Sequence, residues 1–105
     1  MSWASITWIF MHSFAYKIDN TYYKNNKSVP CNVISYICTN LPCPMCKSHA
    51  ILYLKNNNIK LCNTKKEFIN YICNFHNSVN VRLGKKTFTK EECNELYSRC
   101  NFERI

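Results

Sequence analysis

The chain has 105 residues, of which 47% are hydrophobic, so it is long enough for one domain with a modest core and too apolar to be disordered. It contains one glycine and three prolines, and so few turn-forming residues argue against an all-β fold. The net charge of +8 fits a phosphate-bearing cofactor, a nucleic acid or a soluble surface, and it does not choose among them.

Eight cysteines are a high number for a chain of this length. In a secreted chain they would indicate a disulfide scaffold. The first residues, however, lack the basic region of a signal peptide, contain His12, and are too short an apolar run to span a bilayer. We therefore expect a cytoplasmic protein without a membrane span, whose cysteines bind a metal, take part in catalysis or make disulfides.

The hydrophobic pattern predicts helices throughout the chain. Residues 4–17 form the first predicted helix, which carries two adjacent stripes: Ile6, Ile9, Phe10, Ser13 and Phe14 on one, and Trp8, His12 and Ala15 on the other. Residues 19–28 are polar and rich in Asn and Lys, which predicts a loop. A second helix over residues 29–39 ends before Pro42, because the residue before a proline avoids the helical region.

Three further helices complete the predicted fold. Pro44 suits the first turn of a helix that runs to about Leu54. The next helix begins with a capping box at Thr64 and Glu67, ends at Gly84, and has a core stripe of Phe68, Ile72, Phe75, Val79 and Leu83. A second capping box, Thr89 with Glu92, starts a short helix that ends near Cys100. Four main helices and a short fifth one predict an all-α bundle, and we expect residues 1–105 to form a single domain.

The segment "LPCPMCKSHA" at residues 41–50 contains the motif Cys43-x-x-Cys46. Cys43 is predicted at the N-terminus of a helix, where unpaired N–H groups and the helix dipole lower the pKa of a thiol. The motif alone fits a redox pair, a local structural disulfide or half of a zinc site. Cys73 and His76 would complete a Cys₃His zinc site, although both pairs lie at long helices and a bundle with a core needs no metal to fold.

A second group of polar side chains borders the core stripe of the fourth main helix. His76 and Asn80 are one turn apart, and the same spacing relates Trp8 and His12 on the first helix. Each of these residues alone is more typical of core packing or of a solvated surface. Together with Asn77 and the cations Arg82, Lys85 and Lys86, they fit a large flat cofactor with a phosphate tail.

Three motifs occur in one order along the chain: W-x-x-x-H at Trp8–His12, L-P-C-x-x-C-x-x-H-A at Leu41–Ala50, and C-x-x-H-N-x-V-N-x-x-L-G-K-x-x-F at Cys73–Phe88. In this combination the chain resembles the Erv/ALR family of FAD-linked sulfhydryl oxidases over about residues 3–93. The residue sequence of the redox motif is most similar to that of the short family members carried by large cytoplasmic DNA viruses. The resemblance implies a four-helix bundle plus a short fifth helix, FAD at the bundle mouth, and a homodimer.

The resemblance also implies roles for individual residues. Cys43 and Cys46 match the catalytic pair, with Cys43 facing the incoming thiolate and Cys46 against the isoalloxazine of FAD. The positions that match flavin contacts are Trp8, His12, His76, Asn77, Asn80, Leu83 and Lys85. Cys73 matches the first cysteine of a structural disulfide, and Cys93 is its candidate partner although it lies about one helical turn later than in the family pattern. A further departure is Ala4, where many members have Gly.

The implied reaction passes electrons from thiols of protein substrates through the cysteine pair to FAD and then to O₂, which gives H₂O₂. The implied location is the host cytoplasm, with the virion as a second location, and no nucleic-acid partner is expected. Four cysteines have no assigned role: Cys31, Cys38, Cys62 and Cys100. Pairs seven residues apart on one helix, such as Cys31 and Cys38, are about 10 Å apart and should not close. The competing functions are a zinc-stabilised interaction module that uses Cys43, Cys46, Cys73 and His76, and a disulfide-stapled structural protein.

Overall fold

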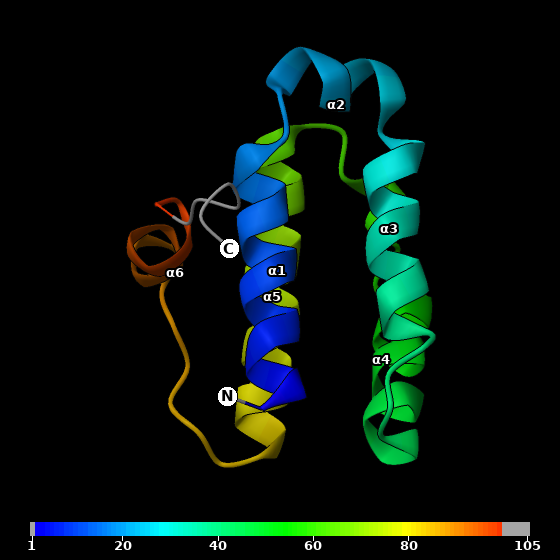
Figure 1. Ribbon diagram of the computed structural model, residues 1–105, viewed down its shortest axis with the longest axis vertical. Helices are drawn as coiled ribbons and strands as arrows, with labels where there is room; N and C mark the ends of the chain where they lie inside the picture. Colours follow the sequence, from blue (N-terminus) through cyan, green and yellow to red (C-terminus); the bar gives the residue numbers. More distant parts are fainter. Residues whose placement is uncertain (1, 100–105) are drawn as a thin grey trace.

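Helices make up the regular structure of residues 2–99, the part of the chain that the computed structural model describes, and this part contains no strand. The helices are α1 (Trp3–Lys17), α2 (Asn20–Asn26), α3 (Ser28–Cys38), α4 (Pro44–Asn56), α5 (Lys65–Arg82) and α6 (Lys90–Tyr97) (Figure 1). A 3₁₀ turn, η1 (Ile59–Leu61), lies between α4 and α5. The predicted all-α class is therefore confirmed. No described helix has the length and apolar character needed to cross a bilayer.

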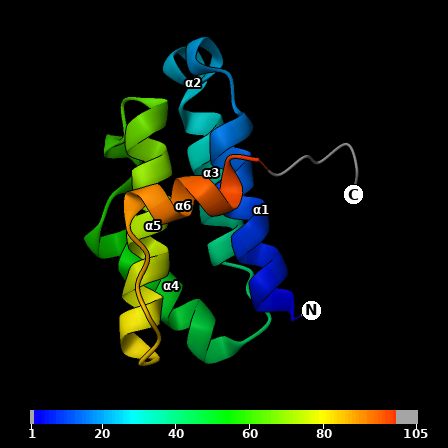
Figure 2. The same ribbon diagram turned by 90° about the vertical axis from the view of Figure 1, so that its left-hand side faces the viewer.

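Two pairs of neighbouring helices build the bundle. Helix α1 packs along α5, and α3 packs along α4, while α2 caps one end of the bundle (Figure 1). Helix α6 crosses the outside of α1 and α5, as the turned view shows (Figure 2). The segment that joins α5 to α6 starts at the end of the bundle where α4 begins, and it runs back along the outside of the bundle to α6 (Figure 1).

The core has apolar side chains from α2, α3 and α5 at its centre. Four of these side chains are 0% exposed: Tyr23, Ile34, Phe68 and Ile72. Of these, Phe68 and Ile72 are one turn apart on α5. Burial of a side chain such as Phe68 contributes about 1.5–3 kcal/mol relative to its exposure to water. The tyrosine hydroxyl of Tyr23 is also satisfied, because it donates a hydrogen bond of 2.6 Å to the carbonyl oxygen of Cys62.

The ends of α5 are those that the sequence predicts. Thr64 and Glu67 form a reciprocal capping box at its start, and Gly84 follows its last residues with φ of 68°. The amide of Lys85 donates to the carbonyl of Asn80 at 2.8 Å, and the amide of Gly84 donates to that of Val81 at 3.1 Å. This is a Schellman motif, which turns the chain sharply away from the helix axis.

The prediction of a loop over residues 19–28 is wrong, because most of this segment is the helix α2. The Asp19 carboxylate caps it by accepting a hydrogen bond of 3.0 Å from the amide of Tyr22. Tyr23 then anchors the helix to the core. The Asn and Lys side chains that indicated a loop lie on the exposed side of a short helix, where composition carries little information. The last helix ends at Tyr97, and Cys100 lies outside the described residues.

Two predicted apolar stripes also differ from the observed burial. On α1 the buried residues are Met11, His12, Ser13 and Ala15, whereas Ile6 is 54% exposed and Phe10 is 40% exposed. Leu83, which was expected in the core stripe of α5, is 56% exposed because it stands at the C-cap of the helix. Helix α1 has apolar residues on more than one side, so its periodicity does not identify the side that faces α5.

Candidate active site

A cavity of about 610 Å³ opens between α1, α4, α5 and the segment after α5. This volume is within the range of pockets that bind cofactors. Its walls include residues from four parts of the chain: Trp8 and Met11 of α1, Cys46 and His49 of α4, His76 and Asn80 of α5, and Lys85 and Phe88 of the following segment. The cavity therefore brings together motifs that are distant in sequence.

The two cysteines of the redox motif lie at the start of α4. Cys43 is the N-cap residue, and its Sγ accepts a hydrogen bond of 3.3 Å from the amide of Cys46, while Pro44 occupies the first helical position. Both thiols are free and half-buried. Only Cys46 is among the residues that line the cavity. The two sulfur atoms thus differ in surroundings, with Cys46 at the cavity and Cys43 beside its edge.

In the reduced pair, the pKa values of the two thiols are shifted in opposite directions. The pKa of Cys43 is lowered, first by the hydrogen bond from the Cys46 side chain, then by the backbone amides of Cys46 and Met45, and further by the positive charge of Arg82. The pKa of Cys46 is raised, chiefly by that same hydrogen bond to Cys43 and by burial. A single negative charge on the pair is therefore held by Cys43, while Cys46 keeps its proton.

Aromatic rings form one wall of the cavity. The ring of Trp8 stacks on that of His76, with centroids 4.0 Å apart and an angle of 5° between the planes. The two histidines are linked by a hydrogen bond of 2.9 Å between His12 Nε2 and His76 Nδ1. Behind them, His12 stacks on Tyr97 with the same centroid distance of 4.0 Å. These contacts fix both imidazole rings in orientation.

Both histidines are neutral at physiological pH. Burial lowers the pKa of His12 to about 3, with a further contribution from His76, and burial together with Lys85 lowers the pKa of His76 to about 4. One ring nitrogen must donate and the other accept in the hydrogen bond between them, which two protonated imidazoles could not do. The wall therefore has hydrogen-bonding capacity but no charge of its own.

Unsatisfied and cationic groups complete the cavity. Asn80 is 5% exposed, and its Nδ2 has no hydrogen-bond partner among the described residues. A buried amide without a partner costs free energy, so this atom fits a polar group of a bound ligand. Arg82, Lys85 and Lys86 also line the cavity. A flat ring system with hydrogen-bonding atoms and an anionic tail matches this set, and FAD has these properties.

A model of the Erv1 / Alr family matches residues 5–98 of the chain. The chain belongs to the Erv1/Alr family. Similar proteins include the FAD-linked sulfhydryl oxidase of African swine fever virus (isolate Tick/Malawi/Lil 20-1/1983), which is 31% identical over 99 residues, or 94% of this chain and 82% of the relative. The corresponding protein of isolate Pig/Kenya/KEN-50/1950 is 30% identical over 106 residues, which cover 100% and 87% of the two chains. The Arabidopsis thaliana FAD-linked sulfhydryl oxidase ERV1 is 26% identical over 93% of this chain and 51% of its own length.

Most positions that match Erv1/Alr flavin contacts meet at the cavity. Trp8, Cys46, His76, Asn80, Leu83 and Lys85 are all lining residues. His12 is 1% exposed and stands behind the wall, where it supports His76. Asn77 is not a lining residue, because both polar atoms of its side chain bond to the backbone of Phe88.

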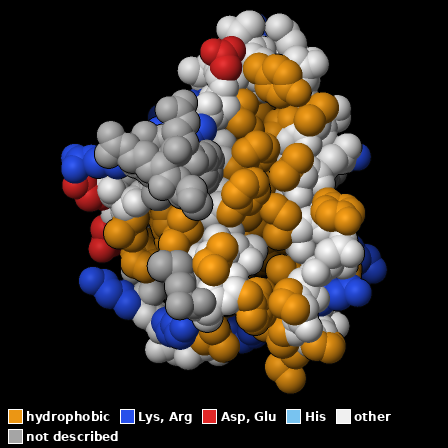
Figure 3. All heavy atoms as spheres, viewed as in Figure 1, with side chains coloured by type: hydrophobic (Ala, Val, Ile, Leu, Met, Phe, Trp, Pro, Cys, Tyr) orange, Lys and Arg blue, Asp and Glu red, His pale blue; other side chains and the backbone are white. Residues whose placement is uncertain are grey.

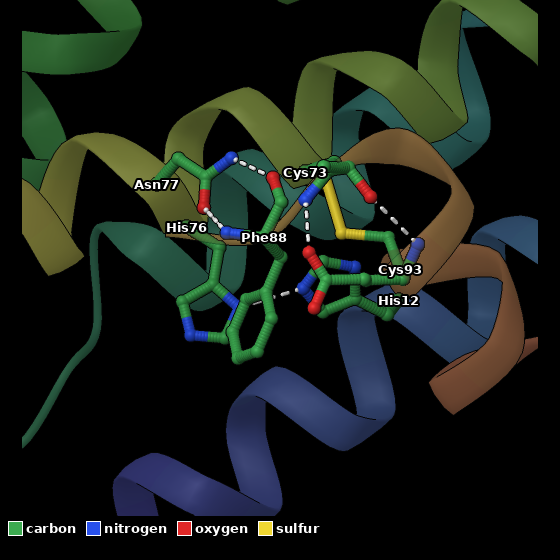
Figure 4. Close-up of a disulfide and its surroundings, with 8 residues drawn as sticks. His12, Cys73, His76, Asn77, Phe88 and Cys93 are labelled. Carbon is green, nitrogen blue, oxygen red and sulfur yellow. Dashed lines mark hydrogen bonds between the residues drawn. A yellow bond between two sulfur atoms is a disulfide. The ribbon is translucent and has the colours of Figure 1, made fainter. Parts of the chain in front are cut away.

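The structure joins Cys73 and Cys93 in a disulfide, the pairing that the Erv1/Alr resemblance implies (Figure 4). Cys31 and Cys38 are free and buried, and Cys62 is also free. The competing prediction of a zinc site is wrong, because Cys73 forms a disulfide with Cys93 and His76 is hydrogen-bonded to His12. In residues 2–99 no group of three or more His, Cys, Asp or Glu side chains could hold a metal ion.

Several cavity residues were not expected from the sequence. Cys38 and Tyr97 line the cavity although they belong to no motif, and His49, whose role the sequence leaves open, lines it as well. Phe88 closes the third Erv1/Alr motif, so its place in that motif is the signal that could have found it. The sequence identifies Arg82 as a cation but gives no sign that it acts on the redox pair, where its charge lowers the pKa of Cys43.

Proposed function

We propose that the chain is an FAD-dependent sulfhydryl oxidase that forms disulfide bonds in thiol-containing protein substrates. The observation that carries this proposal is that Cys46 of the redox pair lines the same cavity as the Trp8–His76 stack and the unpartnered amide of Asn80. The names of the viral and plant relatives support it. Residues 1–105 would serve as one oxidase domain.

The chain's own residues account for the thiol chemistry. A substrate thiolate attacks Cys43 Sγ of the oxidised pair, which forms a mixed disulfide and releases Cys46 as the leaving thiolate. A second substrate thiol then attacks the substrate sulfur of the mixed disulfide, so the substrate disulfide forms and the Cys43 thiolate leaves. The lowered pKa of Cys43 makes it the better leaving group of the two.

FAD would be held by Trp8, His76, Asn80, Leu83 and Lys85, and when bound it supplies the two-electron chemistry that couples the reduced pair to O₂ and yields H₂O₂. The neutral imidazole of His76, fixed by His12, offers a hydrogen bond without adding charge beside the redox pair. The cations at the mouth, Lys85 and Lys86, are suited to the phosphate groups.

The proposed function is tested by comparing the amounts of O₂ consumed, H₂O₂ released and disulfide formed. The purified chain is expected to bind FAD and to consume O₂ when given a reduced protein thiol, with one H₂O₂ released for each disulfide formed. An oxygen electrode, a peroxide assay and a thiol titration measure the three quantities on the same sample. A flavin-free sample is the matched control. If the FAD-loaded protein consumes no O₂ with protein thiols or with a small dithiol, the proposed function is wrong.

The same proposal includes a homodimer that forms through α1 and α3. Hydrophobic side chains gather in a band over these two helices (Figure 3). A groove there is lined by Phe10, Val29, Asn32, Val33, Tyr36 and Ile37, none of which is charged. On a chain with a net charge of +8, this face can meet a second copy of itself without charge repulsion.

The viral relatives further support a protein that works in the host cytoplasm.

Substitution Val29→Asp is expected to convert the dimer to a monomer, measured by light scattering after size-exclusion chromatography. Val29 is 48% exposed and lies in the first turn of α3, where an acidic residue favours the helix, so the fold should be retained. The same change at Leu61, which is 70% exposed and is not part of the groove, should leave the dimer intact. A monomeric wild-type chain, or a Val29→Asp dimer of unchanged stability, would contradict this interface.

A further inference from the structure

One side of the cavity is closed by a segment without regular secondary structure. Residues 85–89 lead from the turn after α5 to the start of α6, and Lys85, Lys86 and Phe88 of this segment line the cavity. Such a wall has no helix of its own to hold it in place. Its position therefore depends on its contacts with α5 and α6.

The segment is tied down at both of its ends. At the first end, the amide of Lys85 donates to the carbonyl of Asn80 at 2.8 Å. At the other end, the side chain of Asn77 bonds to both backbone groups of Phe88, and α6 follows at once with its cap at Thr89. The path between the two ends is short, so these contacts fix the course of the backbone that carries Lys85 and Lys86.

The contact between Asn77 and Phe88 is a two-point contact. Asn77 Oδ1 accepts a hydrogen bond of 2.8 Å from the Phe88 amide, and Asn77 Nδ2 donates one of 2.7 Å to the Phe88 carbonyl (Figure 4). A pair of this kind sets the distance of the Phe88 backbone from α5 and also its orientation. It also uses one acceptor and one donor of the Asn77 amide.

The side chain of Phe88 lines the cavity, so the position of the Phe88 backbone determines where this part of the wall lies. Its ring lies 5.6 Å from the ring of His76, and it packs against the buried group of Cys73, Cys93 and Tyr97. The ring of His76 therefore contacts both Trp8 and Phe88. A shift of the Phe88 backbone would move both the lysines at the mouth and one neighbour of His76.

We propose that Asn77 is a positioning residue for FAD, which acts through the Phe88 backbone to hold the wall formed by residues 85–88 in the shape that binds the cofactor. The family resemblance alone would place Asn77 in contact with the flavin. The cavity lining and the two hydrogen bonds instead place it behind the wall. The inference rests on the proposed function, because it takes FAD as the cofactor.

Substitution Asn77→Asp tests the inference by its dependence on pH. At about pH 7.5 the carboxylate can still accept from the Phe88 amide, but it repels the Phe88 carbonyl, so the dissociation constant of FAD should rise at least about tenfold. The facing carbonyl oxygen raises the pKa of this carboxyl group, so at about pH 5 we expect it to be protonated and to donate again. The FAD affinity should then return to within about twofold of the wild-type value at the same pH. Flavin fluorescence during titration of the flavin-free protein measures both constants.

Two further variants complete the experiment. Asn74→Asp makes the same change on an exposed residue of α5 and should leave FAD binding unchanged at both pH values. Asn77→Leu cannot be rescued by protons and should bind FAD weakly at both. Wild-type affinity of Asn77→Asp at the higher pH, or a loss that persists at the lower pH, would overturn the inference.

If circular dichroism shows that Asn77→Asp does not fold at the higher pH, Asn77→Ser replaces it. Serine is too short to reach both backbone groups, so weaker FAD binding with full helicity is expected, and wild-type affinity would refute the positioning role. Failure of the proposed function looks different, since the wild-type chain would then not oxidise thiols even when it binds FAD.

Discussion

Cys43→Ser and Cys46→Ser each lower kcat for a small dithiol by at least about 10³-fold, because a single remaining thiol cannot form the disulfide that accepts electrons from the substrate. Both variants are expected to keep their FAD, since the hydroxyl of serine is close in size to the thiol. Oxygen consumption and the visible flavin spectrum measure the two properties on one sample. Cys62→Ala is the matched control, because Cys62 is a free thiol that does not line the cavity. Turnover that survives in either serine variant would remove the pair from the mechanism.

The two variants also separate the roles of the two thiols. In Cys46→Ser the thiol of Cys43 keeps a hydroxyl donor and the backbone amides, so its pKa should stay below the value of about 8.5 for free cysteine. A lowered pKa means that the thiolate persists at lower pH, so the midpoint of alkylation by iodoacetamide shifts to lower pH. Adding Arg82→Met should move that midpoint upward, whereas adding Lys86→Met should move it less. A midpoint at or above that of free cysteine would contradict the polarisation of the pair.

Removal of the Cys73–Cys93 disulfide is expected to lower the free energy of unfolding by about 3 kcal/mol, the chain-entropy value for a loop of this length. The two cysteines are 20 residues apart in sequence and join α5 to α6. For a domain of this size the loss lowers Tm by more than about 10 °C. Urea unfolding of Cys73→Ala/Cys93→Ala at a fixed FAD concentration measures the change.

A double-mutant cycle shows whether the bond itself is responsible. Each single substitution already breaks the disulfide, so Cys73→Ala and Cys93→Ala should each cost nearly as much as the double substitution. Two single effects that add up would indicate two separate packing losses and no bond. Turnover with a small dithiol should fall less than in the redox-pair variants, because neither Cys73 nor Cys93 lines the cavity that contains Cys46.

Local signals predict the ends of several helices correctly. The capping boxes at Thr64 and Thr89 and the stop at Gly84 depend on residues within one turn, so they can be recognised without knowledge of the fold. Local sequence does not predict helix α2, because Tyr23 anchors it through contacts with residues far along the chain. The buried side of α1 was also not predictable, because apolar residues such as Ile6 and Phe10 surround it.

The candidate site also contains some residues that local sequence identifies and others whose roles depend on tertiary contacts. The motifs identify Cys43, Cys46 and His76, whose chemistry is visible in their residue types and spacing. The contact between Asn77 and Phe88 joins a helix to an irregular segment 11 residues later, and no periodicity predicts such a contact. The proximity of Arg82 to the redox pair likewise depends on the packing of α5 near the start of α4. Sequence therefore identifies candidate reactive groups by their residue types and spacing, while the contacts that position them depend on tertiary structure.

The position of Cys43 as the N-cap of α4 has a consequence for the driving force of the reaction. Its sulfur accepts the hydrogen bond of the Cys46 amide in the reduced state, and a thiolate is a stronger acceptor than a disulfide sulfur. The first turn of α4 is thus better capped when the pair is reduced than when it is oxidised. Any interaction that favours the reduced form raises the reduction potential of the pair, so the helix itself helps to draw electrons out of substrate thiols.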